Sequence, residues 1–232
     1  MIPKEIKMGF LRDSINIASR DILIESRRAY EILSTIFFAI SAVIMSSIAW
    51  GTPISITIEE GVASLWIIIF FTSILLFTTS FAREMDRGTI GGLRTIPSSP
   101  LAILFGKVIY SVIMMLLVLV VILPLSVVFL NIQPTIQIFE LLFILIIGVV
   151  NLSFAGSFVS SIVMYSEGKT LLLPFLLFPI AIPVFVPAIL SSEKALRGLG
   201  FNEYSGELRI LGAFFILVIM ISVFSFETIL EE

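Results

Sequence analysis

Six long apolar blocks constrain this chain more than any other feature of its sequence. Each has about 20 residues, the length that a helix needs to cross a hydrocarbon layer of roughly 30 Å. Across the chain 58% of the residues are hydrophobic and only 13% are charged, against about 25% charged in a soluble domain. We therefore predict an all-α polytopic membrane protein with six transmembrane helices. The expected spans are 32–50, 62–81, 108–130, 138–163, 170–190 and 210–226.

The uneven distribution of lysine and arginine sets the predicted orientation. Six of them precede the first block, four lie in the loop after the second block, and Lys169 follows the fourth, so one face receives 11 of the 14. Because loops rich in Lys and Arg stay in the cytoplasm, both termini are expected there. The expected organisation is a cytoplasmic segment over 1–29, a transmembrane domain over 30–228 and a cytoplasmic tail over 229–232.

Residues 10–28 are predicted to form an amphipathic helix that lies on the membrane surface. Ile17 and Ile24 project from the polar side and make the pattern imperfect. A soluble tail that leads into the first span is the alternative interpretation, since such a tail needs no apolar stripe. The apolar stripe recurs at spacings of three and four positions and consists of Leu11, Ile15, Ala18 and Ile22.

The longest predicted cytoplasmic loop, 82–107, is typical of a docking element. It has about 26 residues, whereas a passive connection between helices needs only a few. Glycines and prolines break regular helix within it, and Ile90 and Leu93 give it a small apolar edge. We expect this loop to dock onto a cytoplasmic partner. The alternative is an ordinary loop that anchors its helices through arginine side chains reaching the membrane surface.

The fifth block is unusual for a membrane span because it contains four prolines. Each proline lacks an N–H and clashes with the carbonyl four residues earlier, so that carbonyl loses its helical partner. In hydrocarbon an unpaired carbonyl is costly, and it must face protein, water or another donor. We predict a kinked or broken helix on the protein-facing side, and leave open whether it is a functional hinge or a structural kink. The prolines are Pro174, Pro179, Pro183 and Pro187.

The chemistry of several functional classes is missing from the sequence. No ionisable residue lies near the middle of a predicted span, and the chain has neither His nor Cys. Ion- and proton-coupled transporters normally keep ionisable groups at that depth. A P-loop motif and the common hydrolase motifs are also absent. We therefore expect no catalytic residue, metal, bound cofactor or nucleic-acid partner, and any energy for transport must come from another subunit.

Several stretches resemble the haem exporter protein B (CcmB) family, permease-like subunits of the cytochrome c maturation ABC transporter that are related to ABC-2-type permeases. RDILIESRR leads into a first span that contains Phe37 and Phe38, and FAREMDRGTIGGL is followed by Pro97. The span TLLLPFLLFPIAIPVFVPAIL is similar to the proline-rich fifth span of the family. Gly91 departs from the family, which usually has an acidic residue there, so no charged contact is assigned to this position.

The resemblance implies a transmembrane permease subunit that exports or delivers haem for c-type cytochrome maturation in the plasma membrane of a prokaryote. The implied partners are a cytoplasmic ATPase that uses ATP (the A protein), a haem-handling membrane subunit (the C protein) and membrane lipid. A homodimer or a second membrane subunit is also expected, since six spans are half of a typical ABC transporter. By matching motifs, the ATPase-coupling loop comprises Arg83, Glu84, Asp86, Arg87, Gly88, Thr89, Ile90, Leu93 and Arg94.

Two other functions remain open at this point. One is an ABC-2 permease that exports another lipophilic cargo, because the loop alone fits other members of that class. The other is a non-transporting membrane scaffold that couples ATP hydrolysis to the remodelling of a haem complex.

Overall fold

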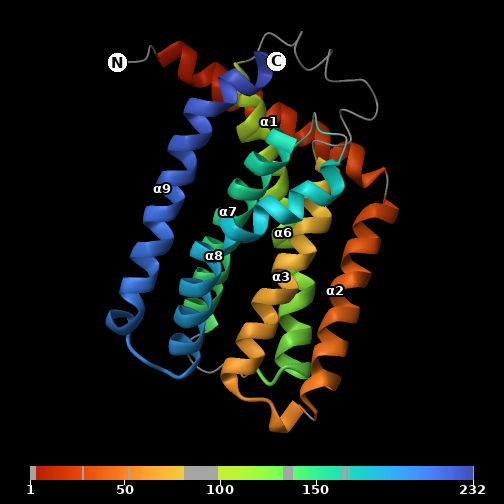
Figure 1. Ribbon diagram of the computed structural model, residues 1–232, viewed down its shortest axis with the longest axis vertical. Helices are drawn as coiled ribbons and strands as arrows, with labels where there is room; N and C mark the ends of the chain where they lie inside the picture. Colours follow the sequence, from red (N-terminus) through yellow and green to blue (C-terminus); the bar gives the residue numbers. More distant parts are fainter. Residues whose placement is uncertain are drawn as a thin grey trace.

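The computed structural model describes residues 4–27, 29–51, 53–80, 99–132, 138–163, 166 and 168–231, which form a bundle of long helices (Figure 1). Six of these helices are long and apolar enough to cross a membrane, and no strand occurs among the described residues. The predicted all-α fold with six spans is therefore confirmed. The helices are α1 (Lys4–Ser26), α2 (Ala29–Trp50), α3 (Ile58–Ser80), α6 (Pro100–Phe129), α7 (Ile138–Val163), α8 (Lys169–Leu196) and α9 (Phe201–Glu231), with a short 3-10 helix η1 (Pro53–Ser55).

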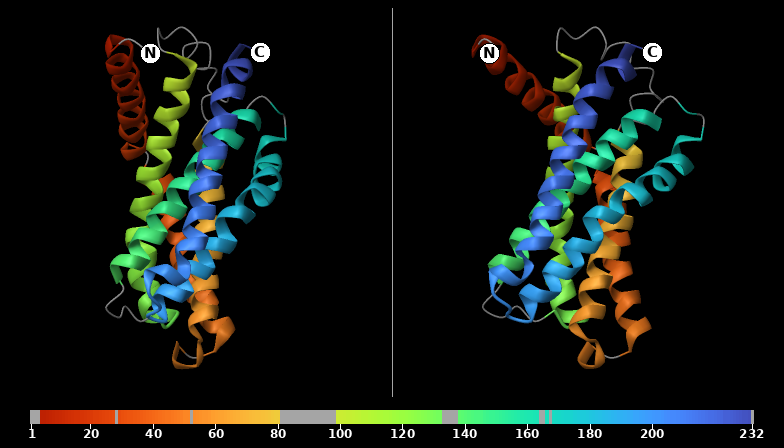
Figure 2. Two further views of the ribbon diagram at one scale, coloured as in Figure 1. Left: turned by 90° about the vertical axis from the view of Figure 1, so that its left-hand side faces the viewer. Right: turned by 60° about the vertical axis from the view of Figure 1, so that its left-hand side comes forward.

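The six spans alternate in direction, which gives the bundle two distinct ends. We call the end crossed by α1 the α1 end and the end that carries η1 the opposite end. Figures 1 and 2 show that α1 and the last turns of α9 lie at the α1 end. The last turn of α3 and the first turns of α6 lie there too.

Several helices extend beyond the expected spans. Helix α6 begins at Pro100 rather than at residue 108, because Ser99 is its N-cap and its hydroxyl accepts a hydrogen bond from the Ala102 amide. Serine at the N-cap and proline at the first helical position both favour a helix start. Residues 100–107, which we expected in the cytoplasmic loop, are therefore helical. Helix α9 likewise begins at Phe201 rather than at residue 210.

The interior of the bundle is built around α7, in which residues 151–161 are all buried. Two glycines of α7 allow α3 to approach closely. A Cβ on Gly148 would overlap the Trp66 ring, and a Cβ on Gly156 would overlap the Phe77 ring. Both aromatic side chains are fully buried. Small residues at such positions are a common means of packing membrane helices.

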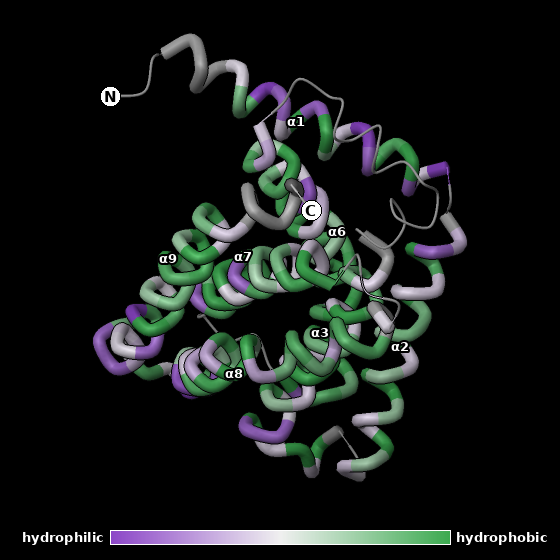
Figure 3. The backbone as a smooth tube through the Cα atoms, turned by 45° about the horizontal axis from the view of Figure 1, so that its top comes forward, coloured by the Kyte–Doolittle hydropathy of each residue, from purple (hydrophilic) through white to green (hydrophobic). Residues whose placement is uncertain are grey.

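The outside of the bundle is apolar along the spans and more polar at the ends and on α1 (Figure 3). Large apolar side chains point outward on most spans, among them Phe37 on α2, Phe139 on α7 and Phe224 on α9. A soluble protein rarely exposes so much apolar surface. This surface fits a bilayer as the surrounding solvent.

Candidate functional site at the α1–α6 junction

Helix α1 packs along the first turns of α6 at the α1 end (Figures 1 and 2). The two backbones approach closely at Gly106, where a Cβ would lie 2.8 Å from the Cβ of Ile17 and 3.0 Å from the carbonyl oxygen of Ser14. The rings of Phe10 and Phe105 meet edge to face with their centroids 5.4 Å apart. The buried face of α1 consists of Ser14, Ile17, Ala18, Asp21 and Glu25.

A buried ion pair joins the two helices. The Lys107 Nζ lies 2.7 Å from the Asp21 Oδ2, and the two side chains are only 3% and 8% exposed. Farther along both helices, the Tyr110 hydroxyl donates a 3.0 Å hydrogen bond to the Glu25 Oε2. Removing one partner of a buried pair leaves the other charge uncompensated, at a cost of about 3–5 kcal/mol. These contacts therefore set the register of α1 along α6.

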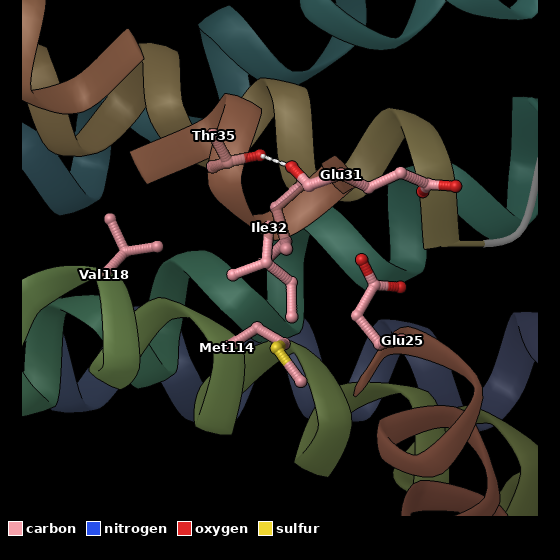
Figure 4. A pocket seen from close by; sticks show the side chains of 7 residues that line it. Glu25, Glu31, Ile32, Thr35, Met114 and Val118 are labelled. Atoms are coloured by element: carbon pink, nitrogen blue, oxygen red, sulfur yellow. Dashed lines mark hydrogen bonds between the residues drawn. The ribbon is translucent and has the colours of Figure 1, made fainter. Parts of the chain in front are cut away.

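A small pocket lies beside this junction, where α1, α2, α3 and α6 meet (Figure 4). Its volume of about 30 Å³ has room for one or two water molecules at most. Glu25 and Glu31 border the pocket, and the Thr35 hydroxyl donates a 3.0 Å hydrogen bond to the Glu31 carbonyl. The remaining lining is apolar and comes from Ile32, Leu76, Met114 and Val118. The lining of the pocket is thus polar beside Glu25 and Glu31 and apolar elsewhere.

The predicted ATPase-coupling loop lies outside the described residues, from Arg83 and Glu84 through to Arg94. The structure does place the helices on either side of it. Helix α3 ends at Ser80 and α6 begins just after Ser99. Helix α6 runs without interruption from its N-cap, Ser99, to Lys107, and Lys107 pairs with Asp21 of α1.

Helix α1 forms as predicted, but its predicted apolar stripe is divided. Ala18 is buried and Ile22 packs against the core, whereas Leu11 and Ile15 are exposed. Ile17, which projects from the expected polar side, is also buried against α6. The exposed Leu11 and Ile15 remain available for the membrane surface, and the interfacial location of α1 stays a prediction.

Sequence reasoning missed the polar residues of this junction. Asp21 and Glu25 are four positions apart, and Lys107 and Tyr110 are three apart, so each pair lies on one face of its helix. That spacing was the signal in the sequence that these polar residues could contact a common partner. It could not show that two segments more than 80 residues apart in the chain would face each other.

Helix α8 runs unbroken through its four prolines, from Lys169 to Leu196. It bends along its length, so that its first half turns across the bundle (Figures 1 and 2). Pro187 is buried and Pro174 and Pro183 are half-buried, but Pro179 is exposed. The irregular part of α8 therefore faces protein only in part.

A second polar cluster lies at the opposite end of the bundle. Lys194 of α8 makes a 2.7 Å ion pair with Glu207 of α9 and donates a 2.8 Å hydrogen bond to the Glu203 carbonyl. Arg197 pairs with Glu193 and with Glu59 of α3. These contacts tie the end of α8 to its neighbours, and they explain why α8 and α9 continue beyond the expected spans.

The sequence pattern of the CcmB protein family matches residues 12–232, nearly the whole chain. The chain belongs to the CcmB family. A comparison with curated proteins finds no match. The family match begins within α1 and includes both partners of the Asp21–Lys107 ion pair. CcmB proteins are membrane subunits of the haem exporter that serves cytochrome c maturation, in an ABC transporter context, so this chain is a multi-pass protein of the prokaryotic cell membrane.

Proposed function

We propose that this CcmB protein is a permease subunit driven by a separate cytoplasmic ATPase, and that the ATPase acts on the α1 end of the bundle. The observation that carries the proposal is the buried α1–α6 junction. It begins directly after the connection that was predicted to dock onto the ATPase, and it continues into the core of the bundle. A displacement of this connection would therefore move α6 and α1 together.

The distribution of buried charge supports energy input at this end. Within the described part of the chain, the buried charged side chains are Asp21, Glu25 and Lys107, all at the α1 end. Deeper in the bundle the buried polar side chains are hydroxyls and amides, such as Ser157 and Asn151. Coupling to an ion or proton gradient normally needs ionisable groups at mid-membrane. The bias of Lys and Arg makes the α1 end cytoplasmic.

The proposed division of labour assigns ATP to the partner and no cofactor to this chain. The A protein would bind and hydrolyse ATP, and the C protein would handle haem beside the CcmB subunit. A second copy of the chain would complete the membrane part of the transporter, since six spans are half of the usual number.

Co-purification tests the site of ATPase docking. We expect Arg87→Glu combined with Arg94→Glu to abolish recovery of the ATPase with the CcmB protein from detergent-solubilised membranes, while membrane insertion is unchanged. Arg209→Glu is the matched control, because Arg209 is exposed and lies near the opposite end. Full recovery of the ATPase with the double variant would show that the loop is not the docking element.

A non-transporting scaffold remains the second candidate, and one observation favours it. The pocket among α1, α2, α3 and α6 has room for water only, and the larger hollows on α2 and between α3 and α8 open sideways to the membrane. Reconstitution of the full complex in sealed vesicles separates the two functions. ATP-dependent movement of haem across the vesicle membrane supports transport, and ATP hydrolysis without such movement supports the scaffold.

A further inference from the structure

The two halves of α8 are packed very differently. In the C-terminal half, Ala181, Val184, Ala188, Ser191 and Ala195 are completely buried. In the N-terminal half, Leu171 is 79% exposed and Phe175 is 76% exposed, although Leu173 and Leu177 still contact the bundle. The C-terminal half is therefore buried along a continuous face, whereas the N-terminal half makes fewer contacts with the bundle.

Two of the four prolines of α8 lie between its exposed and its buried half. Pro179 and Pro183 have no N–H, so the carbonyls of Phe175 and Pro179 lose the donors that a regular helix would supply. These positions separate the exposed half of α8 from the buried half. Kinks at prolines are a recognised point of bending in long helices.

One aromatic side chain of α3 contacts α8 on both sides of these two prolines. The Phe70 ring contacts Phe178 on one side of the two prolines, with centroids 6.0 Å apart, and Phe185 on the other side, with centroids 4.9 Å apart. Trp66 holds the C-terminal half, because its ring meets Phe185 and its Nε1 donates a 3.1 Å hydrogen bond to the buried Ser192 hydroxyl. Phe70 is thus placed as a pivot, and Trp66 as an anchor.

The N-terminal half also has space into which it can move. A hollow of about 450 Å³ separates it from α3 and opens to the outside of the bundle. Its lining is apolar and comes from both helices, including Phe71 and Ile74 of α3 and Phe175 of α8. None of the residues that line this hollow is charged or strongly polar.

We propose that α8 is a hinged gate. Its N-terminal half, residues 169–178, swings about Pro179 and Pro183 over the Phe70 ring and opens or closes the hollow beside α3. Its C-terminal half stays fixed through Trp66 and Ser192. The gate would control sideways access to the bundle in the half of the membrane next to the α1 end. This property belongs to the chain itself and does not depend on an ATPase.

Distances between spin labels in the purified chain, reconstituted in lipid nanodiscs, test the hinge. The chain has no cysteine, so Leu171→Cys with Met45→Cys places the only two labels on the moving half and on α2. Val186→Cys with Met45→Cys is the matched pair for the fixed half, and all three positions are exposed. Excess unlabelled chain limits the measurement to distances within one molecule.

We expect a broad distribution with more than one population for the 171–45 pair and one narrow population for the 186–45 pair. Pro179→Ala with Pro183→Ala should narrow the first distribution, because it restores two backbone donors. Pro124→Ala in α6 should leave it unchanged, and Phe70→Ala should broaden it further. Equally narrow distributions for the two pairs in the unmodified background would overturn the hinge, even if the proline variant fails to fold.

Discussion

The two ends of the bundle use the same kinds of ion pair in different surroundings. At the α1 end, Asp21 and Lys107 pair where almost no solvent reaches them. At the opposite end, Arg197 and Glu193 pair with 44% and 22% of their side chains exposed. Burial makes a broken pair expensive, whereas exposure lets water replace a lost partner. The comparison teaches that breaking the buried Asp21–Lys107 pair should cost more stability than breaking the exposed pair of Arg197.

The largest expected effect comes from breaking the buried pair. Lys107→Met should lower the free energy of unfolding by up to about 3–5 kcal/mol. It removes the buried cation of the Asp21 carboxylate and leaves, among the described residues, only the exposed Arg20, 3.5 Å away, as a partner. Reversible unfolding in detergent micelles measures the change. Adding Asp21→Leu to this variant should recover most of the loss, since an apolar pair of similar size carries no uncompensated charge. A single variant as stable as the unmodified protein would contradict the role of the pair.

A pair of tyrosines gives the next comparison. Tyr110 donates to Glu25 inside the α1–α6 junction, and Tyr204 donates to Glu140 near the opposite end. We expect Tyr110→Phe to cost about 1.5–3 kcal/mol, the range for a hydrogen bond to a charged group. Tyr204→Phe should cost less, because Glu140 is only half-buried and can turn to solvent. Equal losses in the same unfolding measurement would show that the two ends do not differ in this way.

A smaller effect is expected from closing the gap at Gly106. Gly106→Ala would bring a methyl group against Ile17 and the Ser14 backbone, and such overpacking costs about 1–3 kcal/mol. Gly212→Ala in α9 is the matched control, because nothing lies within 4 Å of a Cβ there and alanine favours helix. Protease susceptibility of α1 reports whether it has left α6. Unchanged protection in Gly106→Ala would argue against close packing of the two helices.

The smallest effect should follow from Arg197→Ala at the opposite end. Its ion pairs are exposed, and exposed pairs contribute about 0.2–1 kcal/mol each. The loss should shrink further at high salt, since added ions screen exposed charges. A loss as large as that of Lys107→Met, and insensitive to salt, would remove the distinction between the two ends.

The sequence predicted the spans well and their ends less well, for a physical reason. The apolar blocks show which residues can lie in hydrocarbon. A helix can extend beyond its apolar block wherever an N-cap residue or a polar partner stabilises the additional turns. Ser99 and Pro100 carried a start signal that was assigned to a loop, and α9 begins among polar residues that pair with α7 and α8. The α1–α6 junction was harder still, because Asp21 and Lys107 become partners only when two distant segments meet.

By itself the sequence determined that this chain has six helices long and apolar enough to cross the membrane. That property follows from local composition and does not depend on which helices are neighbours in space. Tertiary structure alone decided which face of α1 is buried, that Gly106 and Lys107 of α6 contact that face, and that Phe70 contacts both halves of α8. These features depend on contacts between helices that are distant in the sequence. Such contacts form, and stabilise the protein, only when the helices pack together.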